Sequence, residues 1–217
     1  MDGPRTSPLI VPLGDRALLV RFGDTLSDDA NKAAADFARR VLAEAIPGVA
    51  EVVPGLVSVM LRYEAEVSFT QLSREVQMRL GAGSEADAPQ KPVRTIGIAF
   101  DGGDLPEVSA LFHIDEAEFV RRHNASQLRV LATGFAPGFV YCGFHPENLE
   151  LPRRLAVRPM VPAGTVLFAA RQTAIAATPI RTGWHVIGRT VFRNFDPTAA
   201  SPTKLTVGEP IRFEVAR

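Results

Sequence analysis

The chain has 217 residues, and its 24 lysine and arginine residues balance 24 aspartate and glutamate residues, so the formal net charge at pH 7 is zero. A protein that binds nucleic acid by neutralising phosphates carries a basic excess, which this composition lacks. Hydrophobic residues make up 46% and charged residues 22%, as in folded globular proteins and unlike disordered chains. One large domain or two smaller ones are compatible with this length.

The single cysteine, Cys142, excludes an internal disulfide and a cysteine-based zinc site. The first eight residues lack the basic stretch and apolar core of a signal peptide. No apolar run approaches the roughly 18 to 20 residues that a membrane span needs. We therefore expect a cytoplasmic protein with neither nucleic-acid nor membrane partners.

The first part of the chain predicts two hairpins, each followed by a helix. Apolar runs at 9–13 and 17–22 form the first hairpin, and Ser27 is a suitable N-cap for the helix that follows. The buried stripe of this helix recurs at helical spacing and comprises Ala34, Phe37, Val41 and Ala45.

The second hairpin is predicted from residues 49–53 and 58–63, and Ser68 with Gln71 has the spacing of a capping box. The stripe of the second helix comprises Phe69, Leu72, Val76 and Leu80. A ββαββα order places two helices on one face of an antiparallel sheet, which predicts an α+β domain over residues 1–83. Residues 84–92, rich in small and polar residues and proline, read as a linker.

Residues 93–217 form the predicted second domain, which is mainly β. It opens with a strand at 93–100, and Asp115 caps a helix that carries Phe119 and His123. Short apolar runs separated by glycine and proline then indicate a barrel or a sandwich. The candidate strands are 128–135, 166–170, 172–176, 185–189 and 211–215.

Common catalytic motifs are absent from the sequence. It contains no Walker A segment, no H-E-x-x-H and no G-x-S-x-G, so any ATP is not held in a P-loop. The four histidines are too scattered to define a metal site. Cys142 reads as a small buried hydrophobe because no basic residue adjoins it.

Two segments have unusual composition. Residues 134–141 interleave glycine, proline and aromatics, which suits either a rigid pocket loop or a barrel corner. Arg153, Arg154 and Arg158 lie among prolines and apolar residues, where guanidinium groups can bind a carboxylate or phosphate. Spacing alone favours the other interpretation, in which these arginines contact the protein's own acids.

Taken together, several segments resemble a known family, the B subunit of bacterial 5-oxoprolinase, also called allophanate hydrolase subunit 1 or the inhibitor of a sporulation histidine kinase. The segments run in the family's order and carry its carboxyltransferase subdomain C and D pattern. They are PLGDRALLVRFG, VVPGLVSVMLRYE, GFAPGFVYCG, LPRRLAVRPMVPAGTV, QTAIAATP, GWHVIGRT and NFDP. The resemblance implies an N-terminal ferredoxin-like α/β sandwich and a C-terminal cyclophilin-like β-barrel.

The resemblance also implies a function. Together with a C subunit and a separate A subunit, such a protein opens 5-oxoproline to L-glutamate at the expense of ATP. Transfer of a phosphoryl group to the lactam oxygen would activate this poor electrophile before water attacks. ATP, with Mg²⁺, would be supplied by the complex, and no cofactor is built into this chain.

Site residues follow from the same resemblance, with no metal ligand among them. The catalytic candidates are His123 as a proton carrier, Gln172 orienting the amide and Arg158 contacting the anion. The remaining candidates contact or enclose the substrate. They are Arg153, Arg154, Thr173, Phe135, Pro137, Gly138, Phe139, Tyr141, Trp184 and Arg189.

The chain departs from the family pattern before Gln172, where the usual turn glycines are replaced by Ala170 and Arg171. A turn with positive φ would be strained there. Two alternatives to 5-oxoprolinase therefore stay open. One is a carboxyltransferase subunit of the urea and allophanate route, and the other is a non-catalytic module that inhibits a histidine kinase.

Overall fold

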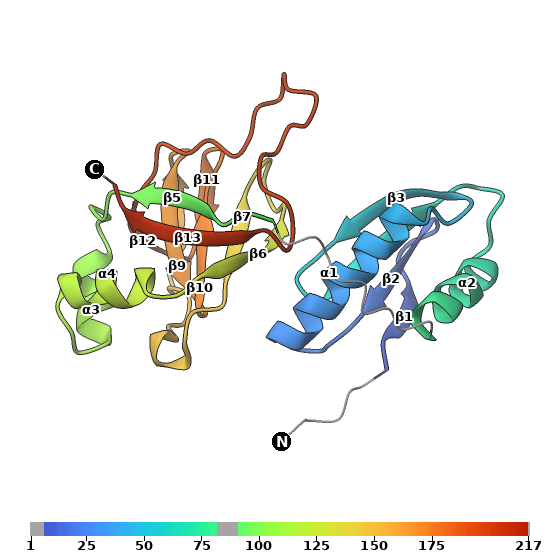
Figure 1. Ribbon diagram of the computed structural model, residues 1–217, viewed down its shortest axis with the longest axis horizontal. Coiled ribbons are helices and arrows are strands. Elements are labelled where there is room, and N and C mark those ends of the chain that lie inside the picture. Colours follow the sequence, from blue (N-terminus) through green and yellow to red (C-terminus); the bar gives the residue numbers. More distant parts are fainter. Residues whose placement is uncertain (1–6, 82–90, 217) are drawn as a thin grey trace. The chain divides into compact units, whose positions relative to one another are not determined.

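The computed structural model describes residues 7–81 and 91–216, and the chain divides into two compact units, 1–90 and 91–217 (Figure 1). Most of the predicted linker at 84–92 lies outside the described residues. Each unit is described by itself. No helix in the described ranges is long and apolar enough to cross a bilayer.

The N-terminal unit is a four-stranded antiparallel sheet with two helices, as predicted for an α/β sandwich. The strand order is β1-β2-β4-β3, because each hairpin pairs internally and β2 joins β4. The elements are β1 (Leu9–Pro12), β2 (Ala17–Arg21), α1 (Asp28–Ala43), β3 (Val49–Pro54), β4 (Ser58–Tyr63) and α2 (Phe69–Gly81).

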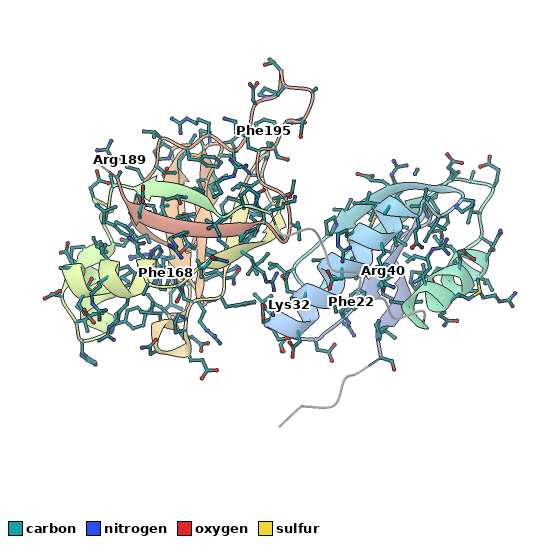
Figure 2. The ribbon with its side chains drawn as sticks, viewed as in Figure 1. Phe22, Lys32, Arg40, Phe168, Arg189 and Phe195 are labelled. Carbon is teal, nitrogen blue, oxygen red and sulfur yellow. The ribbon has the colours of Figure 1, made fainter. Side chains whose placement is uncertain are left out.

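Local signals account for both helices of this unit. The Ser27 hydroxyl accepts the Ala30 N–H at 3.2 Å, and the Ser68 hydroxyl accepts the Gln71 N–H at the same distance. The helices and the sheet share one core, to which β2 and β4 contribute every second residue. The largest fully buried side chain of this core is Phe37, which packs against Phe22. Phe22 is labelled in Figure 2.

The C-terminal unit is built on a seven-stranded sheet of order β12-β9-β10-β7-β6-β13-β5. The β13–β5 pair is parallel, and the other neighbours are antiparallel. Its strands are β5 (Arg94–Ile98), β6 (Leu128–Thr133), β7 (Val140–Gly143), β9 (Thr165–Ala169), β10 (Gln172–Ile175), β12 (His185–Arg189) and β13 (Pro210–Val215).

A single bridge joins the two edges of this sheet and nearly closes it into a barrel. Ala99, which follows β5, exchanges backbone hydrogen bonds of 2.8 and 2.9 Å with Arg189 at the end of β12. Gly188 permits this approach, because a Cβ atom there would lie 2.3 Å from the Ala99 oxygen. The Thr190 hydroxyl donates to the Gly97 carbonyl at 2.7 Å, which adds a side-chain hydrogen bond between the same two edges of the sheet. The predicted barrel is thus confirmed.

Two helices follow β5, and the sequence predicted only the second. α3 (Leu105–Leu111) is a short helix after Asp104, and α4 (Glu116–Asn124) begins at the predicted cap, where the Asp115 carboxylate accepts the Glu118 N–H at 2.7 Å. Phe119 and Phe168 meet edge to face in the barrel core, with ring centroids 5.4 Å apart.

Both faces of the β7–β9–β10 region are buried. Val166 and Phe168 of β9 contribute to the barrel core, whereas Leu167 and Ala169 contribute to a second apolar cluster on the opposite face. The antiparallel pair β8 (Arg158–Val161) and β11 (Ile180–Thr182) contributes to that second cluster. A strand buried on both sides is apolar at every position, which explains why β9 does not alternate. A short 3₁₀ helix, η1 (Glu147–Leu149), completes the elements.

The two-residue turn between β9 and β10 has positive φ angles at both central residues, although neither is glycine. Ala170 and Arg171 have φ values of 48° and 60°, as a type I′ hairpin turn requires. Arg171 is held there because its carbonyl accepts the His145 N–H at 2.8 Å and its Nε donates to the His145 carbonyl at 2.9 Å.

Replacing Ala170 by glycine should therefore raise the free energy of unfolding by about 0.5–1 kcal/mol, since glycine removes the left-handed penalty at some entropic cost. The check is the urea midpoint followed by fluorescence of Trp184, the only tryptophan of the sequence. Ala199→Gly, an exposed site without positive φ, serves as the control and should not stabilise. A lower midpoint for Ala170→Gly would contradict the assignment.

Candidate functional site

Most of the predicted site residues fall into three groups rather than one. The buried histidine pair comprises His123, His145 and Thr173. The Asp104 network comprises Asp104, Glu107, Arg154 and Arg158. The aromatic–arginine face comprises Phe135, Phe139, Tyr141, Trp184 and Arg153.

In the buried histidine pair, two imidazoles share one hydroxyl inside the barrel. The Nε2 atoms of His123 and His145 lie 2.7 and 2.8 Å from the Thr173 Oγ1, and the two ring centroids are 4.6 Å apart. His123 Nδ1 lies 2.7 Å from the Asn124 Oδ1. If Nδ1–H donates to Asn124, the Thr173 hydroxyl donates to His123 and accepts from His145, so one proton arrangement satisfies all three bonds.

Burial keeps both histidines neutral. It lowers the pKa of His123 from 6.5 to about 4, against the opposing effect of the Asn124 hydrogen bond. Burial also lowers the pKa of His145 well below its ordinary value, and the neighbouring His123 and Arg171 act in the same direction. Both rings are fully buried. The structure therefore brings His123 and Thr173 together, as the predicted site requires, but encloses them in the core.

This pair makes stability dependent on pH. Because the folded pKa of His123 lies below the unfolded value, the unfolded chain binds the proton first as the pH falls. Stability should be full above about pH 6.5 and decline toward pH 4, with a loss of about 2 kcal/mol at pH 5 from this residue and a further loss from His145.

Urea unfolding at pH 7, 6 and 5, followed by Trp184 fluorescence, measures this decline. The exposed His113 lies outside the pair, so His113→Gln should leave the pH profile unchanged. A midpoint that does not move between pH 7 and pH 5 would contradict the prediction.

Gln172 lies on the opposite face of β10 from Thr173, because successive residues of a strand alternate. Its side chain is buried, and its Nε2 lies 3.4 Å from the Ala170 carbonyl. Its Oε1 has no hydrogen-bond partner among the described residues. The predicted amide-orienting residue is thus separated from the buried histidine pair by the sheet.

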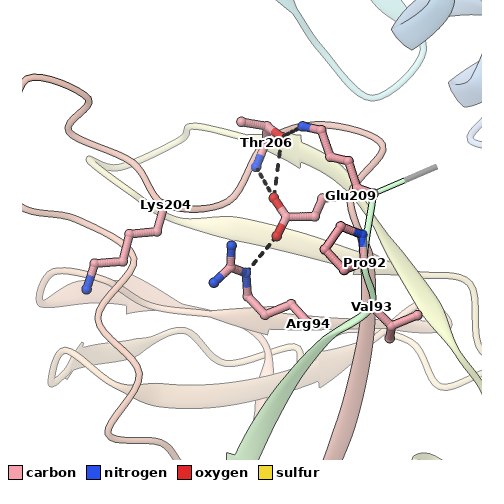
Figure 3. A pocket seen from close by; sticks show the side chains of 7 residues that line it. Pro92, Val93, Arg94, Lys204, Thr206 and Glu209 are labelled. Carbon is pink, nitrogen blue, oxygen red and sulfur yellow. Dashed lines mark hydrogen bonds and ion pairs between the residues drawn. The ribbon is translucent and has the colours of Figure 1, made fainter. Parts of the chain in front are cut away.

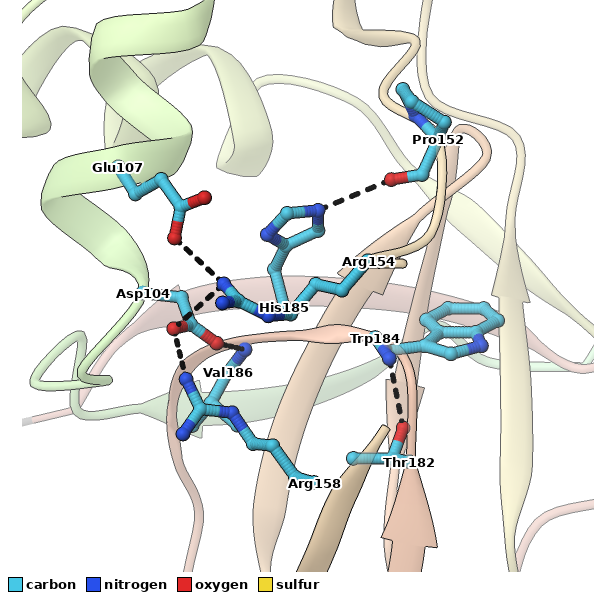
Figure 4. A network of polar contacts seen from close by, with 9 residues as sticks. All are labelled: Asp104, Glu107, Pro152, Arg154, Arg158, Thr182, Trp184, His185 and Val186. Atoms are coloured by element: carbon cyan, nitrogen blue, oxygen red, sulfur yellow. Dashed lines mark hydrogen bonds and ion pairs between the residues drawn. The ribbon is translucent and has the colours of Figure 1, made fainter. Parts of the chain in front are cut away.

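The Asp104 network neutralises two of the three predicted anion-binding arginines (Figure 4). The almost fully buried Asp104 carboxylate pairs with Arg158 and lies 3.2 Å from the Arg154 Nη1. Its second oxygen accepts the Val186 N–H at 2.7 Å. Arg154 also pairs with Glu107 at 2.6 Å. These contacts match the interpretation in which the arginines meet the protein's own acids.

The segment that carries Arg153 is fixed along the start of β12. The Arg154 N–H donates to the Gly183 carbonyl at 2.7 Å, and the His185 Nε2 donates to the Pro152 carbonyl at 3.1 Å. Arg153, between these contacts, places its guanidinium carbon 5.4 Å from the Trp184 ring centroid, at cation–π distance. Arg153 is exposed, and no acid pairs with it among residues 7–81 and 91–216.

Four aromatic rings form the rest of the aromatic–arginine face. Trp184 and Tyr141 have centroids 5.8 Å apart, Tyr141 and Phe139 4.8 Å, and Phe139 and Phe135 5.6 Å. Burial raises the pKa of Tyr141, and Arg153 opposes the shift. Phe135 is 76% exposed, so one end of this row faces solvent. Phe139 and Trp184 are buried, so the face is a row of aromatic rings that reaches solvent at Phe135 and carries a planar cation at its other end.

The loop before β7 shapes one end of this face. Gly138 has a φ of 69°, and a Cβ atom there would lie 2.4 Å from the Phe195 Cβ, so glycine is required. Its carbonyl accepts the Asn194 Nδ2 at 2.8 Å. Pro137 is exposed in the same loop. The segment is therefore a rigid loop that positions Phe135 and Phe139.

Arg189 and Cys142 do not belong to any of the three groups. The Arg189 side chain is exposed and pairs with Asp101 at 2.6 Å, while its backbone closes the barrel. Cys142 is fully buried, and burial raises the pKa of its thiol. Within the described ranges, no three histidine, cysteine, aspartate or glutamate residues gather as a metal site would require.

Sequence reasoning missed two residues that organise these groups, His145 and Asp104. The sequence pattern indicates only a structural or surface role for His145, and no local signal indicates its contact with Thr173, 28 positions away. Asp104 precedes Leu105-Pro106, a helix-start signal that could have drawn attention to it. Its carboxylate makes no cap hydrogen bond at the start of α3 and instead forms ion pairs with Arg154 and Arg158.

Comparison with known proteins gives relatives along most of the chain. The 5-oxoprolinase B subunit of Escherichia coli O157:H7 is 34% identical over 77% of this chain and 78% of its own length. That of Bacillus subtilis is 29% identical over 94% of this chain and 91% of its own length.

Solved structures resemble the fold closely. TTHA0988 matches with a TM-score of 0.82 and 32% identity over 93% of this chain, which spans 40% of that protein. PH0987 of Pyrococcus horikoshii matches with a TM-score of 0.55 and 28% identity over 96% of this chain and 97% of its own. The urea carboxylase of Kluyveromyces lactis, at 14% identity and a TM-score of 0.71, shares the fold alone.

The family model described as "Carboxyltransferase domain, subdomain C and D" matches residues 8–205, which cover most of both units and include all three groups of site residues. This match and the bacterial relatives agree with the architecture seen in the structure. The chain belongs to the carboxyltransferase subdomain C and D family, together with the bacterial proteins named as the B subunit of 5-oxoprolinase.

Proposed function

We propose that this chain is a subunit of an ATP-dependent 5-oxoprolinase and that Arg153 on the aromatic–arginine face binds the carboxylate of 5-oxo-L-proline. The relatives named as the 5-oxoprolinase B subunit support the substrate class. The observation that carries the site is the exposed, acid-free guanidinium of Arg153 against Trp184.

Charge distribution distinguishes Arg153 from its neighbours. Arg154 and Arg158 already share the Asp104 carboxylate, so binding a substrate anion there would compete with an existing ion pair. The planar guanidinium group of Arg153 has no acidic partner in the part of the chain that the structure describes, so it can bind both oxygens of a carboxylate through two parallel hydrogen bonds. The indole beneath it restricts the guanidinium and lowers the entropic cost of binding. The ring of the lactam would then lie beside the partly buried Tyr141.

Partner subunits complete the proposed enzyme. A C subunit and an A subunit would cover this face and supply the site for ATP with Mg²⁺. ATP would transfer its γ-phosphoryl group to the lactam oxygen and leave as ADP. Water would then add to the activated amide carbon, and loss of inorganic phosphate with cleavage of the C–N bond would give L-glutamate. This chain's share is to bind and orient the lactam, which fits the absence of a P-loop from its sequence.

The test uses the complex reconstituted from this chain and its partner subunits. Arg153→Ala should lower kcat/KM for 5-oxoproline about 10- to 100-fold, the effect of losing a charged hydrogen bond worth about 1.5–3 kcal/mol. The loss should appear mainly as a higher KM. Arg153→Lys should recover part of it, and Arg212→Ala, an exposed arginine of β13, should behave as the unmodified chain.

Three outcomes would reject the proposal. Full activity of Arg153→Ala would remove Arg153 from the site. Turnover of urea or allophanate in place of 5-oxoproline would favour the carboxyltransferase alternative, and binding to a histidine kinase without turnover of either substrate would favour an inhibitor.

A further inference from the structure

A polar pocket in the C-terminal unit lies apart from all three groups of site residues. Its volume is about 440 Å³, within the range of small-molecule sites. It is lined by the start of β5, the loop before β13 and the first residues after the N-terminal unit (Figure 3). The lining residues are Lys91, Pro92, Val93, Arg94, Lys204, Thr206 and Glu209.

The charge of this pocket is positive. Three cations and one carboxylate line it, and the carboxylate is already engaged on both oxygens. Glu209, whose side chain is 7% exposed, accepts the Arg94 Nε at 2.6 Å on one oxygen and the Thr206 N–H at 3.2 Å on the other. The buried acid therefore organises the wall and repels an incoming anion less than a free carboxylate would.

Part of the donor set of the pocket remains available to a ligand. Glu209 uses only the Nε of Arg94, and no partner binds the two terminal nitrogens within the described chain; in Figure 3 these nitrogens lie on the side facing Lys204. The Lys204 ammonium lies 5.9 Å from the Phe192 ring centroid and near Asp196. Lys91 donates to the Thr206 hydroxyl at 2.6 Å. The Thr206 hydroxyl itself donates to the Glu209 carboxylate at 3.4 Å, so the donors left for a ligand are the terminal nitrogens of Arg94 and the ammonium groups of Lys91 and Lys204.

We propose that this pocket binds phosphate, either as the free ion or as the phosphate group of a small molecule. Guanidinium forks and ammonium groups are the usual partners of phosphate oxygens, and the excess of two positive charges matches a phosphate dianion. The proposal does not depend on the proposed function, because the pocket lies apart from the aromatic–arginine face and its binding is measured without partner subunits.

The experiment titrates inorganic phosphate into the full chain by calorimetry, with chloride at equal ionic strength as the reference. The variants are Lys91→Met and Lys204→Met, singly and together, because both lysines are exposed and neither holds the core. Arg94 is avoided, since its removal would leave buried Glu209 unpaired. Lys32→Met, an exposed lysine of the N-terminal unit, is the matched control.

We expect phosphate to bind the unmodified chain and Lys32→Met equally, and the dissociation constant to rise at least about tenfold in the double variant, in line with two charged hydrogen bonds. ATP that displaces phosphate would assign the site to a nucleotide, and ATP that does not would assign it to the free ion. Binding no stronger than that of chloride, or unchanged binding in the double variant, would overturn the proposal.

Discussion

Asp104→Ala should destabilise the C-terminal unit by about 3 kcal/mol. One almost fully buried carboxylate holds Arg154, Arg158 and the Val186 N–H, so its removal breaks three contacts at once. Loss of one partner from a buried ion pair typically costs about 3–5 kcal/mol. The lower end of that range is expected here because both guanidinium groups are partly exposed and can turn to water.

Urea unfolding followed by Trp184 fluorescence reports on this unit, because the tryptophan lies beside the network on the residue before β12. Glu107→Ala removes an exposed partner of Arg154 only and should change the midpoint little. Asp104→Asn keeps the shape of the side chain, and its urea midpoint should lie between those of Asp104→Ala and the unmodified chain. An Asp104→Ala midpoint equal to that of Glu107→Ala would show that the network does not stabilise the fold.

Thr173→Val should also cost about 3 kcal/mol, through the buried histidine pair. Valine has nearly the same shape as threonine, so packing is kept while both Nε2 atoms lose their shared partner. A buried polar group left without a partner costs about 1–3 kcal/mol, and two such groups are created here. Water cannot replace the lost hydroxyl as a hydrogen-bond partner, since both rings are fully buried.

Thr173→Ser keeps the hydroxyl and removes the methyl group. It therefore distinguishes the contribution of the hydrogen bonds from that of the methyl group. We expect Thr173→Ser to lose much less stability than Thr173→Val at pH 7. If the two variants unfold at the same urea concentration, the methyl group and not the hydroxyl would account for the effect, and the hydrogen-bonded pair would contribute nothing to the fold.

Elements with strong local signals could be predicted from the sequence. The helix caps at Ser27, Ser68 and Asp115 all appear in the structure, because a cap depends on residues only three positions apart. The strands that sequence reasoning missed are short and lie where glycine, proline and arginine interrupt the pattern. They are β7, β8 and β11.

The candidate site was harder to predict because its contacts join distant parts of the chain. Arg153, Arg154 and Arg158 are equivalent in sequence, and only the position of Asp104, some 50 residues earlier, decides which of them is neutralised. The hydroxyl of Thr173 meets His123 across 50 positions. No periodicity carries such information, since side chains that far apart meet only through the path of the backbone.

The neutral composition, the capped helices and the family follow from the sequence, because they rest on composition and short-range pattern. The enclosure of His123 and Thr173 in the barrel, and the exposure of Arg153 against Trp184, follow from the tertiary structure and from no local pattern. The reason is physical. Burial and ion pairing depend on which strands become neighbours, and that order joins segments far apart in the chain.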